Sequence, residues 1–221
     1  MINESWYKNY NKEGRGHVFK NKGLLFQQLA TYRSIVEALR YIEFNNEDCI
    51  LDVGCGSGQS LRQLLDIGYL PYNMYGIDII KDRIIDGDNR FPNIGFHYGD
   101  ATDMPYKDKS FDIVMASTLF IGIKDDSDKK IATEMMRVVK NTGHILLIDW
   151  RYDYFHKEYK ALTQTRIKSL FPNCKVIAKT NGSLIPPIGH FISKNCYQFY
   201  FMVHWLFPFL SGQVTTILRN K

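Results

Sequence analysis

Three glycines, Gly54, Gly56 and Gly58, alternate with other residues directly after a short apolar run. Glycine allows a sharp backbone turn and lets a ligand approach the main chain closely. The residues after the glycines predict a helix, which would offer free N–H groups and the positive end of its dipole to such a ligand. The turn alone also fits dinucleotide binders and plain tight loops, so the residues around it must decide what it binds.

Carboxylates end three successive strands that the sequence predicts. Asp52 stands just before the glycines, where it can accept a hydrogen bond from a cationic amine. Asp78 ends the second strand, where its two oxygens can hold both hydroxyls of a ribose. Asp100 ends the third strand, where a carboxylate can accept from an adenine amino group. Aspartate is a common turn residue, but three aspartates in register indicate one shared site.

The elements that must position these side chains alternate between strands and helices. Strands are expected at 49–53, 74–77, 94–98, 111–115, 144–148, 174–179 and 214–219, and helices at 22–41, 57–67, 80–87, 127–140, 157–170 and about 190–209. The helix over 127–140 is expected to stop at Asn141-Thr142-Gly143, with Gly143 as the glycine that follows a helix end. This order predicts a parallel sheet covered by helices on both faces, with ligands at the carboxyl ends of its strands.

Taken together, these segments resemble class I S-adenosylmethionine-dependent methyltransferases of the small-molecule (type 11-like) subgroup. The resembling segments are 50–58 (motif I), 76–79 (the acidic second motif), 99–106 with 111–114 (the adenine side and fourth strand) and 134–147 (a helix-turn-strand). The turn at Asn141-Thr142-Gly143 departs from the usual Pro-Gly-Gly, which should change the turn and not the fold. The resemblance covers residues 48–150.

The resemblance implies an α/β fold: a three-layer α-β-α sandwich around a mostly parallel seven-stranded sheet with its last strand antiparallel. An N-terminal helix and a helical C-terminal cap are expected in addition. We expect one methyltransferase domain over residues 1–221. Its expected parts are an N-terminal helical segment (1–47), a cofactor-binding core (48–150) and a substrate-side part (151–221) with an aromatic cap at about 182–212.

The implied cofactor is S-adenosylmethionine, which leaves as S-adenosylhomocysteine. The resemblance implies that the glycine turn holds its methionine moiety, Asp78 its ribose, and Asp100 with Ala101 its adenine. The full implied set is Asp52, Gly54, Cys55, Gly56, Gly58, Asp78, Ile79, Asp100, Ala101 and Ser117. Thr118 and Phe120 would line the wall beneath the methyl donor together with Ser117.

Methyl transfer from a sulfonium is an in-line displacement, in which the protein mainly supplies proximity and alignment. A general base helps if the acceptor is a hydroxyl. The candidates are Asp149 at the end of the fifth strand, His156 just beyond it, and His190 in the cap. Each of the three can instead be a structural residue.

Composition limits the class of protein. The 221 residues are 45% hydrophobic, which suffices for one sizeable core. The cysteines Cys49, Cys55, Cys174 and Cys196 form no CxxC pair, and no His/Cys cluster has zinc spacing, so no metal is expected and a cytoplasmic setting fits best. No secretory signal is visible, and the apolar stretch 199–210 is shorter than the roughly 20 residues of a membrane span.

The charge is uneven and leaves the acceptor open. Residues 151–221 carry a net charge of +8 and residues 1–150 a net charge of −3. With the aromatic cap, this suits a small-molecule or glycan acceptor that has an anionic group, bound by a monomer or homodimer. The alternatives are an RNA methyltransferase that uses the basic third, and a cofactor-binding relative without turnover. Residues 115–119 lack the Asn/Asp-Pro-Pro-aromatic motif of nucleic-acid enzymes, so nucleic acid is not the expected acceptor.

Overall fold

The computed structural model describes residues 24–123, 125–153 and 159–220. Within them, seven strands form one sheet in the order β3-β2-β1-β4-β5-β7-β6. The strands are β1 (Ile50–Val53), β2 (Met74–Asp78), β3 (Gly95–Tyr98), β4 (Phe111–Ser117), β5 (Val139–Trp150), β6 (Cys174–Asn181) and β7 (Gln213–Asn220). Neighbouring strands are parallel except where β7 pairs antiparallel with β5 and β6. The expected sheet with an antiparallel last strand is confirmed.

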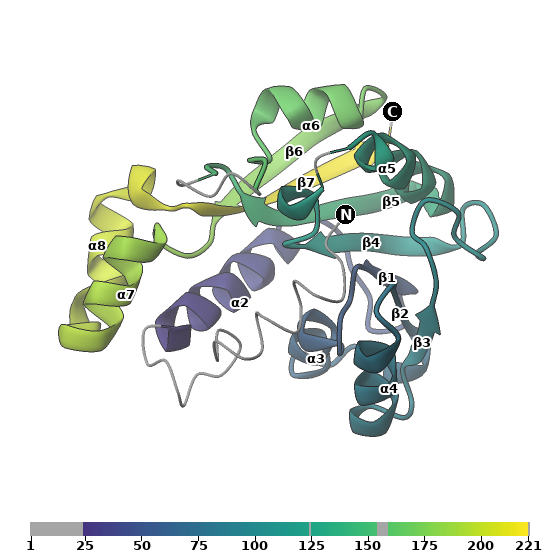
Figure 1. The fold of residues 1–221 in the computed structure, drawn as a ribbon, viewed down its shortest axis with the longest axis horizontal. Coiled ribbons are helices and arrows are strands. Elements are labelled where there is room, and N and C mark those ends of the chain that lie inside the picture. The colour runs from purple at the N-terminus through teal and green to yellow at the C-terminus, as the bar shows by residue number, and fades with distance from the viewer. Residues whose placement is uncertain (1–23, 124, 154–158, 221) are drawn as a thin grey trace.

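Helices cover both faces of this sheet (Figure 1). One face carries α2 (Leu25–Leu39), α3 (Gln59–Leu65) and α4 (Lys81–Arg90), and the other carries α5 (Ser127–Val138) and α6 (Gln164–Leu170). Strand β5 shows the cause: Leu146 and Ile148 are buried in the cluster that α2 and α3 complete, while Ile145 and Leu147 are buried in the cluster of α5 and α6. A strand with two apolar faces requires helices on both sides, which gives the expected three-layer sandwich.

Strand order reverses at β1, which pairs with β2 on one side and β4 on the other. The chain extends the sheet in one direction through β2 and β3, and in the other through β4 and β5. Ligands of open α/β sheets bind at the carboxyl ends of the strands beside such a reversal. Asp52, Asp78 and Ser117 lie at or next to the carboxyl ends of β1, β2 and β4.

Strand β5 begins directly after α5, which shows that the expected helix stop at Asn141-Thr142-Gly143 is wrong. Helix α5 ends at Val138, and the next twelve residues are strand. The pairing of β4 with β5 is irregular between Phe111 and Ile113. A Cβ on Gly143 would lie 2.7 Å from the carbonyl oxygen of Asp112. Gly143 therefore permits a close approach of two strands and does not end a helix.

Two other helices differ from expectation. Helix α6 begins at Gln164, where Thr163 caps it by accepting a hydrogen bond from the N–H of Arg166. Residues 159–163, which were expected to be helical, are not, and 157 and 158 lie outside the described residues. The aromatic helix expected at about 190–209 is two helices, α7 (Pro186–Asn195) and α8 (Tyr200–Leu206), separated at Cys196, which has φ −149° and ψ 51°. Pro208 follows α8 and prevents its extension.

Helices α7 and α8 form a cap that packs on the first half of α2. Ala30 of α2 is buried against Leu184, Ile192 and Tyr200. The Tyr200 hydroxyl accepts a hydrogen bond from the N–H of Leu184 at 3.2 Å. Figure 1 shows the cap at the end of the molecule toward which β4 and β5 run. The cap therefore lies at the carboxyl edge of the sheet, where the sequence predicts it.

Candidate cofactor-binding site and active site

The glycine turn after β1 adopts a backbone that other residues rarely accept. Gly54, Gly56 and Gly58 have φ values of +72°, +56° and +80°. Side chains would also collide, since a Cβ on Gly54 would lie 2.8 Å from Cδ1 of Leu119 and one on Gly58 2.7 Å from Cζ of Phe96. Both conformation and space therefore require glycine at these positions.

The end of β2 holds this turn in place. The N–H groups of Gly54 and Cys55 both donate to the carbonyl oxygen of Ile77, at 2.8 and 3.1 Å. Asp78 accepts from the N–H of Gly56 through Oδ2 and from the N–H of Ile80 through Oδ1, both at 2.8 Å. Each Asp78 oxygen therefore keeps one lone pair for another donor.

Two residues assigned to the cofactor flank Asp78 and the glycines in different ways. The Cys55 side chain is buried, and its Sγ would lie 2.6 Å from a Cβ on Gly76. Burial raises the pKa of this thiol, so it remains protonated. Only the backbone of Cys55 is left to face a ligand, whereas the Ile79 side chain is exposed beside Asp78.

Asp52 is buried next to the turn. In the described part of the chain, its Oδ1 has no hydrogen-bond partner. Burial raises the pKa of Asp52 to about 8, the neighbouring Asp78 carboxylate adds to the rise, and Arg83 opposes it. Buried polar atoms are almost always paired in native proteins. The unpaired oxygen therefore marks a position that a cationic donor would satisfy.

Arg83 belongs to this site although sequence reasoning missed it. It lies in the first turn of α4, and a Cβ on Gly56 would be 2.1 Å from its Nη2 atom. Its guanidinium therefore lies over the glycine turn and acts electrostatically on Asp52. Side chains in a helix point toward its N-terminus, so a cation five residues after Asp78 was the signal that could have found it.

The loop after β3 carries the two residues assigned to adenine. Asp100 is exposed, and its Oδ1 accepts from the N–H of Thr102 at 2.8 Å. Arg137 of α5 donates to the carbonyl oxygens of Met104 and Tyr106 at 2.9 and 2.7 Å. Glu134 pairs with Arg137 and accepts from the N–H of Met104 at 2.7 Å. This cluster anchors the loop that follows Asp100 and Ala101.

The segment after β4 contains a strained residue. Thr118 has φ +56°, in the left-handed region that β-branched residues rarely adopt, and its N–H donates to the carbonyl oxygen of Ile148 at 2.8 Å. Such strain costs about 1–3 kcal/mol and is concentrated at functional sites. The next residue, Leu119, lies over Gly54. The strained turn therefore brings the residues after Ser117 against the glycine turn.

Asp149 binds the same segment from the end of β5. Its carboxylate accepts from the N–H groups of Ile121 and Trp150 at 3.1 and 2.8 Å. Burial raises the pKa of Asp149 to about 7, although backbone donors oppose the rise. These contacts fix the 3-10 helix Phe120–Gly122. A role as general base stays a prediction.

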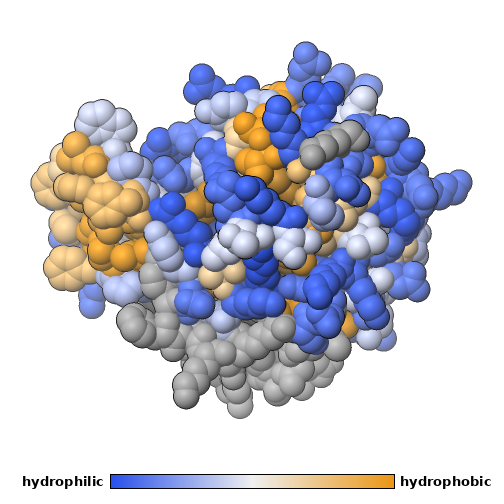
Figure 2. Space-filling model, turned by 90° about the horizontal axis from the view of Figure 1, so that it is seen from above, coloured by the Kyte–Doolittle hydropathy of each residue, from blue (hydrophilic) through white to orange (hydrophobic). Residues whose placement is uncertain are grey.

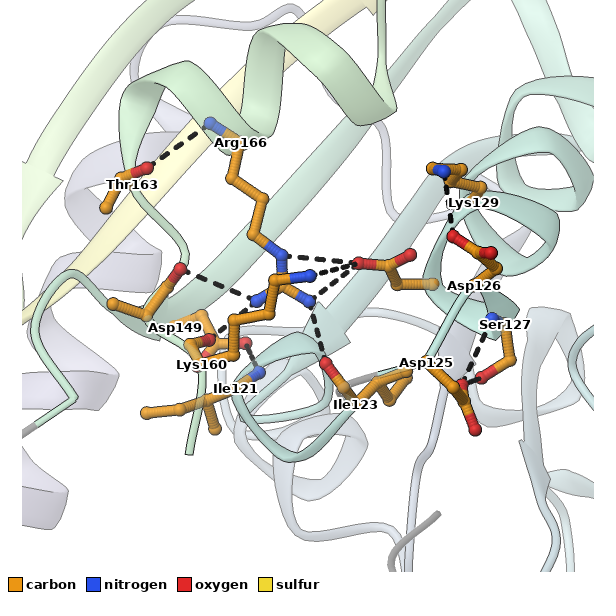
Figure 3. A network of polar contacts seen from close by, with 12 residues as sticks. Ile121, Ile123, Asp125, Asp126, Ser127, Lys129, Asp149, Lys160, Thr163 and Arg166 are labelled. Atoms are coloured by element: carbon orange, nitrogen blue, oxygen red, sulfur yellow. Dashed lines mark hydrogen bonds and ion pairs between the residues drawn. The ribbon is translucent and has the colours of Figure 1, made fainter. Parts of the chain in front are cut away.

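Arg166 of α6 also holds this segment (Figure 3). It donates to the carbonyl oxygen of Ile123 at 2.9 Å and to that of Lys160 at 2.6 Å. Its Nη2 atom lies 2.8 Å from Oδ2 of Asp128, and both side chains are buried. One guanidinium thus joins α5, α6 and the chain that follows β4.

His190 contacts α2 and makes no hydrogen bond to Asp52, Asp78 or Asp149. His190 of α7 hydrogen-bonds through Nε2 to Oε1 of Gln27 at 3.0 Å, and burial lowers its pKa. It therefore links the cap to α2, and its catalytic role stays a prediction. His156 lies outside the described residues. Among the residues that the structure describes, no group of three or more His, Cys, Asp or Glu could hold a metal ion.

Known proteins match the central part of the chain. A family model described as a methyltransferase domain matches residues 50–143. A demethylmenaquinone methyltransferase from Renibacterium salmoninarum is 30% identical over 122 residues, which are 55% of this chain and 49% of that protein. The eEF1A lysine and N-terminal methyltransferase of Bos taurus is 29% identical over 58% of this chain and 18% of that protein. The chain therefore spans half or less of the length of these relatives.

Solved structures share the fold at low sequence identity. A TehB-like SAM-dependent methyltransferase from Corynebacterium glutamicum has a TM-score of 0.64 and 14% identity, and the match covers 99% of this chain and 100% of that one. A geranyl diphosphate C-methyltransferase from Streptomyces coelicolor, solved with S-adenosyl-L-homocysteine, has a TM-score of 0.63 and 12% identity, with coverage of 86% and 80%. At this identity the likeness establishes the fold alone.

Proposed function

We propose that this chain moves a methyl group from S-adenosylmethionine to an oxygen or nitrogen atom of a small-molecule or glycan-type acceptor. Through residues 50–143 the chain belongs to the class I S-adenosylmethionine-dependent methyltransferase family. The observation that carries the proposal is the buried pair Asp52 and Asp78 on either side of a left-handed glycine turn. The family implies the cofactor, and the residues at this edge fit it.

Several groups of the cofactor have suitable partners at this edge of the sheet. The unpaired Oδ1 of Asp52 suits the cationic amine of the methionine moiety. The free lone pairs of Asp78 suit the ribose hydroxyls. We add Arg83 to the assigned residues, because its guanidinium beside Gly56 suits the carboxylate of the same methionine moiety. Asp100 has one oxygen engaged by Thr102 and one available for adenine.

When bound, the cofactor would supply a methyl group attached to a sulfonium. The thioether that remains after transfer is neutral, so its departure needs no proton from an acid. The protein then contributes binding and alignment, a contribution that reaches about 7–11 kcal/mol for well-oriented reactants. Thr118, Asp149 and Arg166 fix the segment 117–123 that faces the glycine turn. Their part in this proposal is to hold the wall of the site.

The acceptor class rests on the substrate-side part of the chain. The aromatic cap lies at the carboxyl edge of the sheet (Figure 1). The sequence from 159 to 221 contains eight lysines and arginines and no acidic residue. An acceptor with an apolar or sugar-like body and an anionic group suits this surface.

Transfer of labelled methyl groups tests the proposal. The purified chain is incubated with methyl-labelled S-adenosylmethionine and a fractionated extract of its native host, with the Asp78→Ala variant as the matched control. We expect label in small polar or lipid-linked material, and loss of labelling with Asp78→Ala. Label in nuclease-sensitive or protease-sensitive material would refute the acceptor class. Equal labelling by both proteins would refute the site.

A further inference from the structure

The outer face of the cap is apolar and exposed. Trp205, Phe209 and Phe191 expose 75%, 65% and 64% of their surface. The exposed apolar residues of the cap are Phe191, Tyr197, Phe199, Met202, Trp205, Leu206, Phe207 and Phe209. Figure 2 shows hydrophobic atoms gathered at this end of the molecule. Apolar surface collected in one place marks an interaction site more often than scattered exposed residues do.

The inner face of the same helices is fixed in the fold. Tyr200 and His204, one turn apart on α8, are buried, and Nε2 of His204 donates to the carbonyl oxygen of Gly182 at 2.6 Å. Arg151 donates to the carbonyl oxygen of Phe209 at 2.9 Å and ties down the end of the cap. The outer residues cannot turn inward without breaking these contacts. A helix that is apolar on both faces is normally buried on both faces. The outer face of the cap is therefore expected to contact an apolar partner.

The cap carries positive charge and no carboxylate of its own. Between Tyr159 and Lys221 the sequence has no aspartate or glutamate. Lys194 is exposed on α7, three residues after Phe191. Arg33 of α2 lies 5.7 Å from the ring centre of Phe201 and forms an ion pair with Glu37 on the same helix. A partner that is apolar and carries negative charge suits this surface, because Lys194 has no carboxylate of the cap to oppose it.

We propose that the outer face of the cap docks on an anionic lipid bilayer, with its aromatic side chains at the boundary between head groups and acyl chains. Exposed Trp, Phe and Leu beside Lys and Arg is the composition of proteins that lie in this interface. The described part of the chain has no helix that could cross a membrane, so the cap rests on the bilayer. A second copy of the chain would bring the same positive charge to the contact, which opposes self-association. Docking of this outer face does not depend on which reaction the protein catalyses.

Vesicle co-sedimentation of the full chain tests this proposal. We expect the protein to bind vesicles of phosphatidylcholine with phosphatidylglycerol at least ~10-fold more tightly than vesicles of phosphatidylcholine alone. Trp205→Ser combined with Phe209→Ser should reduce binding at least ~10-fold, because it removes the two most exposed aromatic side chains of the cap. Tyr72→Ser is the matched control, since Tyr72 is 63% exposed outside the cap; it should bind like the wild type.

Three results would overturn the proposal. The first is no binding to anionic vesicles, and the second is equal binding by the double variant, with its fold verified by circular dichroism. The third is a dimer in light scattering that the double variant abolishes without any vesicle binding by the wild type, which would identify a second copy as the occupant. Lys194→Glu supplies an independent readout, with vesicle binding reduced roughly tenfold and a weaker salt dependence.

Discussion

Replacing Asp52 by Asn should change how the stability of the protein depends on pH. In the folded state burial raises the pKa of Asp52 from 3.8 to about 8. Between these values the folded state holds a proton that the unfolded state has lost, so raising the pH favours unfolding. From about pH 5 to about pH 7 the free energy of unfolding of the wild type should fall by roughly 1.4 kcal/mol per pH unit, or about 3 kcal/mol in total. Asn does not titrate, so the free energy of unfolding of the variant does not fall in this way as the pH rises.

Urea denaturation of both proteins at the two pH values measures the effect. The free energy of unfolding of Asp52→Asn, relative to the wild type, should increase by about 3 kcal/mol from the lower to the higher pH. Other titrating groups contribute equally to both proteins, and a pH-independent cost of the substitution cancels in the comparison. A constant difference would refute the reasoning, because it would mean that Asp52 is ionised in the folded protein and paired with Arg83.

The other predictions concern cofactor affinity and the network around Arg166. Gly56→Val should abolish cofactor binding in calorimetry, because its side chain would collide with Arg83; Gly68→Val, also at positive φ but in open space, should bind normally. Arg83→Gln should weaken binding roughly 10- to 100-fold through the loss of a charge-assisted hydrogen bond, and retained affinity would remove Arg83 from the site. Arg166→Met should lower the free energy of unfolding by about 3 kcal/mol, because the buried Asp128 would keep only its longer ion pair with Lys160 at 3.8 Å; a loss below about 1 kcal/mol would contradict this.

Local sequence signals predicted the sheet and the position of Asp52 and Asp78 at the carboxyl ends of its strands. Gly54, Gly56 and Gly58 require a backbone that few residues accept, and Asp52 and Asp78 follow directly from strand ends. Such features are encoded within a few neighbouring residues. The positions of β1, β2 and β3 along the chain follow from apolar runs in the same way, whereas β5 is much longer than its predicted range.

Local sequence signals did not predict the contacts between segments that are distant in the sequence. Gly143 matched the local signal of a helix end, but the carbonyl oxygen of Asp112 on β4 determines its role. The aromatic run of the cap predicted one helix over about 190–209, but the chain breaks at Cys196 into two. Asp149 has the residue type and position of a base, and only its backbone donors reveal that it holds the chain after β4.

Calorimetric titration with S-adenosylmethionine tests the central claim most directly. We predict one molecule bound per chain, with release of about one proton near pH 7 in buffers of different ionisation enthalpy, because the cationic amine ionises Asp52. Asp78→Ala should bind at least ~10-fold more weakly with its fold retained. Absence of binding by the wild type, or equal affinity of wild type and Asp78→Ala, would contradict the assignment of this edge of the sheet as the cofactor site.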